Sequence, residues 1–278
     1  MTKLPVLVIA RLAYAYVWEN RRKFLALAFP AIVVLGITTG LFSGVLYLAF
    51  PGVVESPGSA PGESLENVLA IPLIMTILVA AAFLTMFAVA WHRHCLVAGE
   101  RPSVRNTLRW GARQTRFLLT AIGLAVLVMI STTAVVVVWV VLSPSGASVS
   151  VLPAALMALV LSSYLYARFS VLFPATALDR TMGVRDAWAM TKGNGWRLLA
   201  IVLMAMIPAS VAATIVQLIL SGLAVAVGLE AALTANLLVA LVDQTFTLTG
   251  TALGVTALSI AYRALETGAR GGQVDLIA

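Results

Sequence analysis

Runs of apolar residues without Lys or Arg, and with one acid in all, divide the sequence into six segments. They cover approximately residues 24–50, 68–90, 117–142, 151–167, 198–229 and 231–262. A helix needs about 17 to 25 apolar residues to cross a hydrocarbon core of roughly 30 Å, so each segment is long enough to span a membrane. The fifth and sixth segments meet at a tight turn around Gly228. This pattern predicts an all-α polytopic membrane protein with six transmembrane helices.

The composition agrees with this pattern over the whole chain. Of the 278 residues, 61% are hydrophobic and 10% are charged, and the mean hydropathy is +1.02. Water-soluble domains do not have such values. We therefore expect a single membrane domain over residues 1–278 and no large soluble catalytic domain. The one cysteine, Cys95, excludes an internal disulfide and a Cys-x-x-Cys metal or redox site.

Positive charge occurs on only one side of the predicted spans. All 18 Lys and Arg residues lie before the first span, between the second and third, between the fourth and fifth, or after the sixth. The three opposite loops contain none, although they hold Glu55, Glu63, Glu66 and Glu230. Because cytoplasmic loops of membrane proteins are enriched in Lys and Arg, we expect both termini to be cytoplasmic.

The cytoplasmic stretches that precede the odd-numbered spans are similar to one another. The second contains Val104-Arg105-Asn106, and the third contains Val184-Arg185-Asp186 at an offset of 80 residues. The first shares only the change from polar to apolar residues. The similarity predicts three parallel repeats of an interfacial helix followed by a transmembrane hairpin, and parallel repeats count against the inverted-repeat transporter folds. The repeats cover residues 1–100, 101–180 and 181–278.

Cations at a spacing of four residues predict the interfacial helix of the second repeat. The row consists of Arg101, Arg105, Arg109 and Arg113, beside an apolar row of Val104, Leu108 and Ala112. The third repeat has a weaker version with Arg185 and Lys192. A helix of this kind lies in the membrane interface, with its cations toward headgroups. We therefore predict that these cations bind anionic lipid headgroups.

Two stretches in the last third of the chain resemble a group of bacterial proteins. They read FPATALD at 173–179 followed by VRDAWAMTKGNGWRLL at 184–199, and ALSIAYRALE at 257–266. This part of the sequence resembles bacterial six-span integral membrane proteins related to the membrane domain of some glycerophosphodiester phosphodiesterases. The resemblance implies a stand-alone protein of a bacterial cytoplasmic (inner) membrane. Nothing in the sequence corresponds to the phosphodiesterase barrel, so the resemblance supplies no catalytic residue.

Small residues line one face of two predicted spans. The first span contains Gly36, Gly40 and Gly44, and the sixth contains Gly250 and Gly254. Glycines four residues apart allow the backbone of another helix to approach closely. We favour packing within the chain, and contact with another subunit is the alternative.

Asp243 is the one acid that lies well inside a predicted span. It shares a helical face with Thr247, and Gln217 and Asn236 are its candidate hydrogen-bond partners. Acids within the membrane often mark a proton or substrate pathway. No second acid, His, Lys or Arg within the membrane could pass a proton on, so we favour a neutral, structural Asp243 over a relay.

His92 and His94 flank Arg93 at the end of the second span. Residues two apart do not face each other on a helix, so we expect an interfacial collar with Trp91 and no metal site. A membrane enzyme would need paired acids, a Ser–His pair or a metal cluster at one depth. We find none and expect no catalytic residue, cofactor or nucleic-acid partner.

Two classes of non-enzymatic function therefore remain. We favour a membrane scaffold or accessory subunit that binds anionic lipid and either another membrane protein or a second copy of itself. Its basic cytoplasmic face and its small-residue helix faces would make these contacts. The alternative is a transporter or lipid-handling protein with Asp243 in its pathway.

Overall fold

The computed structural model describes residues 3–49, 63–100, 103–142, 152–229 and 232–269, and this part of the chain is helical, with no strand. Six helices are long and apolar enough to cross a membrane, which confirms the predicted number of spans. They are α2 (Arg21–Ala49), α4 (Glu63–Leu96), α6 (Ala112–Leu142), α7 (Leu152–Phe169), α10 (Gly195–Ala226) and α11 (Leu233–Ala269). The fourth span continues through a short break into α8 (Leu172–Ala177).

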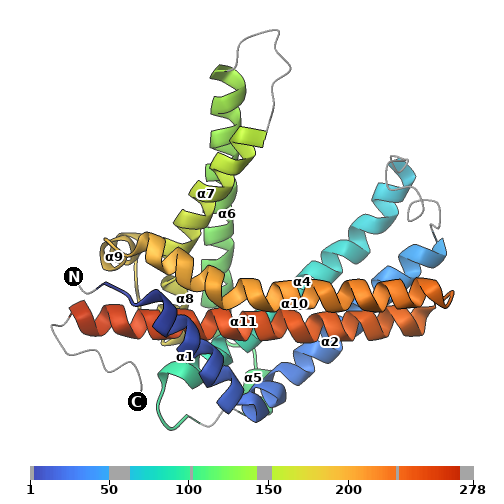
Figure 1. Cartoon of the computed structure of the whole chain (residues 1–278), viewed down its shortest axis with the longest axis horizontal. Helices are drawn as coiled ribbons and strands as arrows, with labels where there is room; N and C mark the ends of the chain where they lie inside the picture. Colours follow the sequence, from blue (N-terminus) through green and yellow to red (C-terminus); the bar gives the residue numbers. More distant parts are fainter. Residues whose placement is uncertain (1–2, 50–62, 101–102, 143–151, 230–231, 270–278) are drawn as a thin grey trace.

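The six long helices form three hairpins that diverge from a common base (Figure 1). The hairpins are α2/α4, α6/α7 and α10/α11, and α11 packs against α2 as well as α10. The hairpin α6/α7 runs in a different direction from α10/α11, so the outer parts of the two hairpins diverge (Figure 1). The helix ends that carry the described Lys and Arg residues lie at the base.

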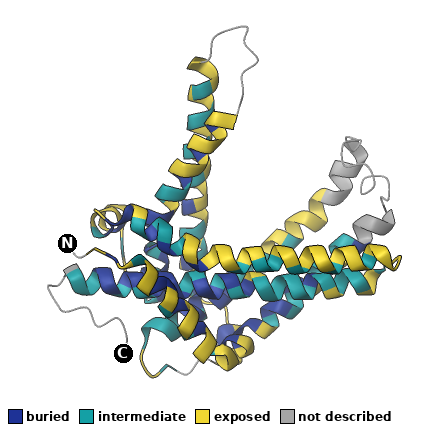
Figure 2. Cartoon of the chain, viewed as in Figure 1, coloured by how far each residue is buried: buried dark blue, intermediate teal, exposed yellow. Residues whose placement is uncertain are grey.

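Buried residues concentrate where the three hairpins meet, whereas the outer parts of the hairpins are mostly exposed or intermediate (Figure 2). Trp91, near the end of α4, is fully buried at this junction. Its ring stacks on Phe87 and lies edge-on to Phe24, and its Nε1 donates to the hydroxyl of Thr256 on α11 at 2.9 Å. The predicted interfacial collar is therefore wrong, because protein covers the end of this span, and His92 is buried beside Trp91.

The glycines of α2 allow it to lie directly on α11. A Cβ atom on Gly40 would lie 2.9 Å from the Cα of Leu237, which is closer than packed atoms approach. On either side, Gly36 faces Leu241 and Gly44 faces Leu233. On the other side of α11, Gly254 faces Met206 and Gly250 faces Ala209, both on α10. All five glycines thus pack against helices of the same chain.

Shorter helices precede each hairpin, at the base. They are α1 (Val6–Glu19), α5 (Val104–Thr107) and α9 (Val184–Met190). Their lengths of 14, 4 and 7 residues differ, and the threefold repeat stays a prediction from the sequence.

The predicted interfacial helix along the row of arginines in the second repeat is wrong. Helix α5 ends at Thr107, and α6 begins at Ala112. The backbone N–H of Gly111 donates to Oε1 of Gln114 at 3.2 Å, which is the way a glutamine at the third helical position caps a helix start. This cap begins a new helix inside the row, so Arg113 belongs to the transmembrane helix α6. Arg101 lies outside the described residues.

Candidate functional site

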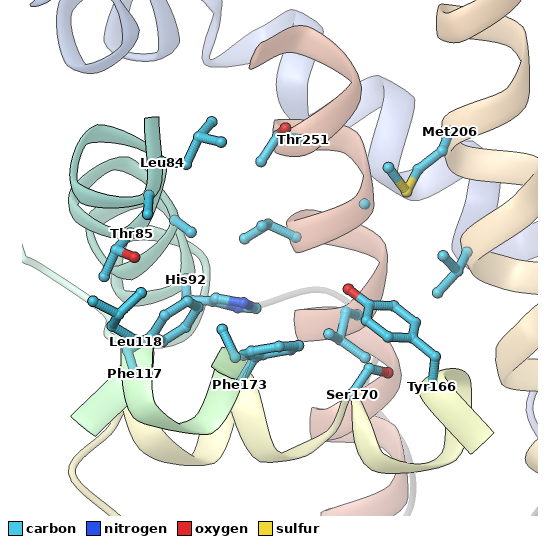
Figure 3. Close-up of a pocket in the computed structure, with 17 residues that line it drawn as sticks. Leu84, Thr85, His92, Phe117, Leu118, Tyr166, Ser170, Phe173, Met206 and Thr251 are labelled. Atoms are coloured by element: carbon cyan, nitrogen blue, oxygen red, sulfur yellow. The ribbon is translucent and has the colours of Figure 1, made fainter. Parts of the chain in front are cut away.

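A cavity of about 410 Å³ lies where the three hairpins meet (Figure 3). Residues of α4, α6, α7, α8, α10 and α11 line it, and most of its wall is aliphatic or aromatic. Leu84, Phe117, Phe173 and Leu258 are examples. Ligand pockets in proteins are typically about 300–1,000 Å³, with apolar walls and a few polar groups. Both the size and the lining therefore fit a small apolar binding site.

Two residues that line the cavity, one on α7 and one on α10, are also exposed at the surface of the molecule. They are Tyr166 of α7 and Met206 of α10, which are 43% and 38% exposed. These two helices belong to the hairpins that diverge in Figure 1. Both helices are long and apolar enough to span a membrane, so these two residues belong to segments that would contact lipid chains.

His92 brings a buried polar group into this apolar wall. It is 1% exposed, and its Nδ1 lies 2.8 Å from the hydroxyl of Ser259 on α11. This contact fixes the ring, and Figure 3 shows the imidazole pointing into the cavity. The described residues offer no hydrogen-bond partner to its other nitrogen, Nε2. Nε2 is therefore available to a bound molecule.

Tyr166 supplies a second polar group from the opposite wall. Figure 3 shows its hydroxyl directed toward the cavity, and no residue of the described part forms a hydrogen bond with it. The hydroxyls of Ser170 and Thr251, which also line the cavity, donate to backbone carbonyls of their own segments, at 2.8 Å in both cases. Thr85 of α4 also lines the cavity, and its hydroxyl has no hydrogen-bond partner among the described residues. His92 and Tyr166 are open hydrogen-bonding groups on facing walls.

A buried arginine supports the base of α7. Arg168 donates to the carbonyl of Trp188 at 2.7 Å and to the hydroxyl of Thr191 at 3.1 Å, and its guanidinium lies 3.4 Å from the centre of the Trp188 ring. It has no carboxylate partner in the described parts of the chain. Since Trp188 belongs to the last turn of α9, the cation meets carbonyls that the helix leaves unpaired. Arg168 therefore ties α7 to α9.

Asp179 forms ion pairs with three arginines at the base. Its carboxylate lies 2.5 Å from Arg113, 2.6 Å from Arg116 and 4.0 Å from Arg93. Its φ of 59° is left-handed, a conformation that Asp and Asn adopt more readily than most residues. The network joins α4 and α6 to the segment after α8. Arg113, predicted to bind a lipid headgroup, is thus engaged by an acid of the same chain.

We expect replacement of Asp179 by Asn to lower stability by about 1 kcal/mol or less at pH 7, because the carboxylate is 36% exposed. The hydrogen bond from Arg113, with the nearby arginine charges, holds the pKa of Asp179 below its ordinary value. A carboxyl with a lowered folded pKa stabilises the fold above its unfolded pKa of about 3.9, and this contribution disappears as pH falls through the folded value. The stability difference between wild type and Asp179→Asn should therefore shrink between pH 7 and pH 3. Thermal unfolding in detergent across this range measures it, and a constant difference would contradict the assignment.

The other predicted headgroup ligands are exposed at the base. Arg105, Arg109, Arg185 and Lys192 are all exposed, and none pairs with a carboxylate of a described residue. They carry uncompensated positive charge on one side of the molecule, as anionic headgroups would require.

Asp243 stands apart from the cavity. It is only partly buried on α11, and Nε2 of its neighbour Gln244 donates to it at 3.3 Å. Gln217, one of its predicted partners, is exposed on α10, and Asn236 donates to the carbonyl of Ala232 at 3.1 Å. The structure thus brings neither predicted partner to Asp243, because Asn236 lies turns away on the same helix and Gln217 faces outward. Asp243 does not line the cavity.

Comparison with known protein families, with curated proteins and with solved structures gave no match. The resemblance to the membrane domain of glycerophosphodiester phosphodiesterases therefore stays a prediction from the sequence. Function has to be inferred from the geometry of the cavity and the base.

Proposed function

We propose that this protein is a non-enzymatic integral membrane protein that binds a lipid in the cavity between its three hairpins. The observation that carries the proposal is the apolar cavity of about 410 Å³, whose lining includes the exposed residues Tyr166 and Met206. The aliphatic and aromatic wall would make van der Waals contact with an apolar chain on several sides at once. The proposal keeps the lipid-handling alternative from the sequence but replaces Asp243 with the cavity.

The positively charged residues at the base would hold the protein against an anionic leaflet. A cation near such a surface contributes about 1 kcal/mol, and Arg105, Arg109, Arg185 and Lys192 are exposed at the base. The placement of all 18 cations outside the predicted spans supports a cytoplasmic base and cytoplasmic termini. With the resemblance to bacterial proteins, this supports location in a bacterial inner membrane.

A scaffold or accessory subunit, with another membrane protein or a second copy as partner, remains compatible with the same basic face. The small-residue faces no longer support it, because Gly36, Gly40 and Gly44 pack on α11, and Gly250 and Gly254 pack on α10. Lipid binding in the cavity needs no partner protein. It also gives the cavity a role, whereas a scaffold function does not.

We expect a phenylalanine at Ala121 to fill the cavity and to remove a co-purifying lipid. Ala121 lines the cavity on α6, whereas Ala125, one turn further along the same helix, is exposed and does not line it. Native mass spectrometry after mild detergent extraction would count the bound lipids. Wild type and the control Ala125→Phe should retain a lipid of defined mass, and Ala121→Phe should lose at least about nine-tenths of it, which corresponds to a loss of at least about 1.4 kcal/mol in binding. Equal occupancy in the two variants, or a wild type without retained lipid, would refute the proposal.

A further inference from the structure

The hydrogen bond between His92 and Ser259 determines which nitrogen of the imidazole can accept. The hydroxyl of Ser259 has one hydrogen, and it donates to the carbonyl of Val255 at 2.8 Å. With that hydrogen directed to the carbonyl, Ser259 accepts from His92 at 2.8 Å, and this arrangement assigns the imidazole proton to Nδ1. In a neutral imidazole the other nitrogen then carries a lone pair. Nε2, which faces the cavity, is an acceptor.

The surroundings of the ring favour this neutral form. The residues that line the cavity include no carboxylate and no Lys or Arg. A buried imidazolium would need a carboxylate or several acceptors around it. The lining also offers no cation to a phosphate, so a phospholipid headgroup would not be stabilised inside.

Tyr166 completes the pattern because its hydroxyl can donate a hydrogen bond from the facing wall. A ligand end that fits both groups must donate to Nε2 of His92 and accept from Tyr166. A single O–H group does both. An alkane, an ether or an ester would leave Nε2 without a donor, and a buried polar group left unpaired costs about 1–3 kcal/mol.

We propose that the cavity selects lipids with a hydrocarbon chain and a compact, uncharged O–H end, which is either a free hydroxyl or an un-ionised carboxylic acid. The O–H donates to His92, and Tyr166 donates to an oxygen of the same group. This inference rests on the proposed lipid binding and adds the chemistry of the polar end. The anionic headgroups expected at the base make a separate contact.

The test compares four probes that differ only at the polar end. They are a long-chain alcohol, its methyl ether, the corresponding fatty acid and its methyl ester, each titrated into the protein in nanodiscs. Wild type should bind the alcohol or the acid about tenfold more tightly than its methylated counterpart. His92→Asn should reduce the preference to about threefold or less, because a methylated probe then leaves no Nε2 unpaired. Asn retains an N–H near the position of Nδ1 for Ser259 and lacks the Nε2 acceptor. Tyr166→Phe, which removes only a hydroxyl, should weaken both members of each pair, because an ether or ester oxygen also accepts from Tyr166.

Nitrogen NMR of the imidazoles gives a second readout. The chain has two histidines, so His94→Gln leaves His92 as the one signal. We expect the Nδ1–H tautomer without ligand, and a shift of the Nε2 resonance with the alcohol or acid but not with the ether or ester. A preference in the alcohol pair alone assigns a hydroxyl lipid, and one in the acid pair alone assigns a fatty acid.

Equal affinity within both pairs, or a proton on Nε2 in the free protein, would overturn this inference while leaving lipid binding intact. Failure of all four probes to bind would instead reject the proposed function. If His92→Asn does not fold, the preference of wild type within each pair and the NMR signal of His92 still decide the outcome.

Discussion

Replacing Gly40 with alanine should destabilise the protein more than the same change at any other described glycine of α2. The new Cβ would lie 2.9 Å from the Cα of Leu237 and 3.2 Å from the carbonyl oxygen of Asn236, and these backbone atoms of α11 cannot rotate away. We expect a loss of about 1–3 kcal/mol, as for overpacked cores, and a larger loss with leucine. Unfolding in detergent monitored by circular dichroism would measure it.

Two control variants make this prediction specific. At Gly44 the closest atom is a methyl of Leu233 at 2.7 Å, which can move to another rotamer, so Gly44→Ala should cost less. At Gly123, on α6, a Cβ would meet no atom within 4 Å. Gly123→Ala should be neutral or stabilising by up to about 1 kcal/mol, since alanine favours helix. If Gly40→Ala were as stable as Gly123→Ala, α2 and α11 would not pack in this register.

The six spans could be predicted from the sequence because each depends on its own apolar run. The sequence also predicts the glycine faces, because residues four apart lie on one face of a helix. It does not predict which helix packs against each face. Whether Gly40 meets α11 or another subunit depends on how the hairpins pack, and that is decided by the fit of Leu237 and its neighbours.

The cavity could not be predicted in the same way, because no single segment contains it. His92 was placed in an interfacial collar, as the position at a span end suggested. Its role depends on Ser259, 167 residues further along the chain, and on Tyr166 in another hairpin. The only local evidence in the sequence was a histidine beside a tryptophan at the end of an apolar run. This pattern fits both the membrane interface and a buried cavity wall.

Charge patterns predicted the side of the membrane better than they predicted contacts. Arg113 and Arg116 lie between two predicted spans in the sequence. In the structure a new helix, α6, starts after Gly111, and both arginines bind Asp179 from this helix. The four-residue spacing of the arginines predicts one continuous helix, and this prediction is wrong. The contact between Gln114 and Gly111 caps the start of a new helix, α6, inside the row of arginines. Arg168 is one of the cations between the fourth and fifth predicted spans, and the structure buries it.

Changing Arg168 to lysine should lower the stability by about 2–4 kcal/mol, although the charge is conserved. The planar guanidinium stacks on the Trp188 ring and at the same time donates in its plane to the Trp188 carbonyl and the Thr191 hydroxyl. A lysine ammonium cannot stack in this way and is more strongly hydrated, so its burial costs more.

The matched control is Arg185→Lys on α9, where the side chain is exposed and a change within about 0.5 kcal/mol is expected. Both variants should insert into the membrane, since neither alters the charge that sets topology. Denaturant unfolding of the two purified variants in the same detergent gives the comparison. Because Arg168 joins α7 to α9, its loss should also loosen the wall that carries Tyr166, and lipid retention should fall with stability. Equal stability of Arg168→Lys and Arg185→Lys would mean that the guanidinium is not held between α7 and α9.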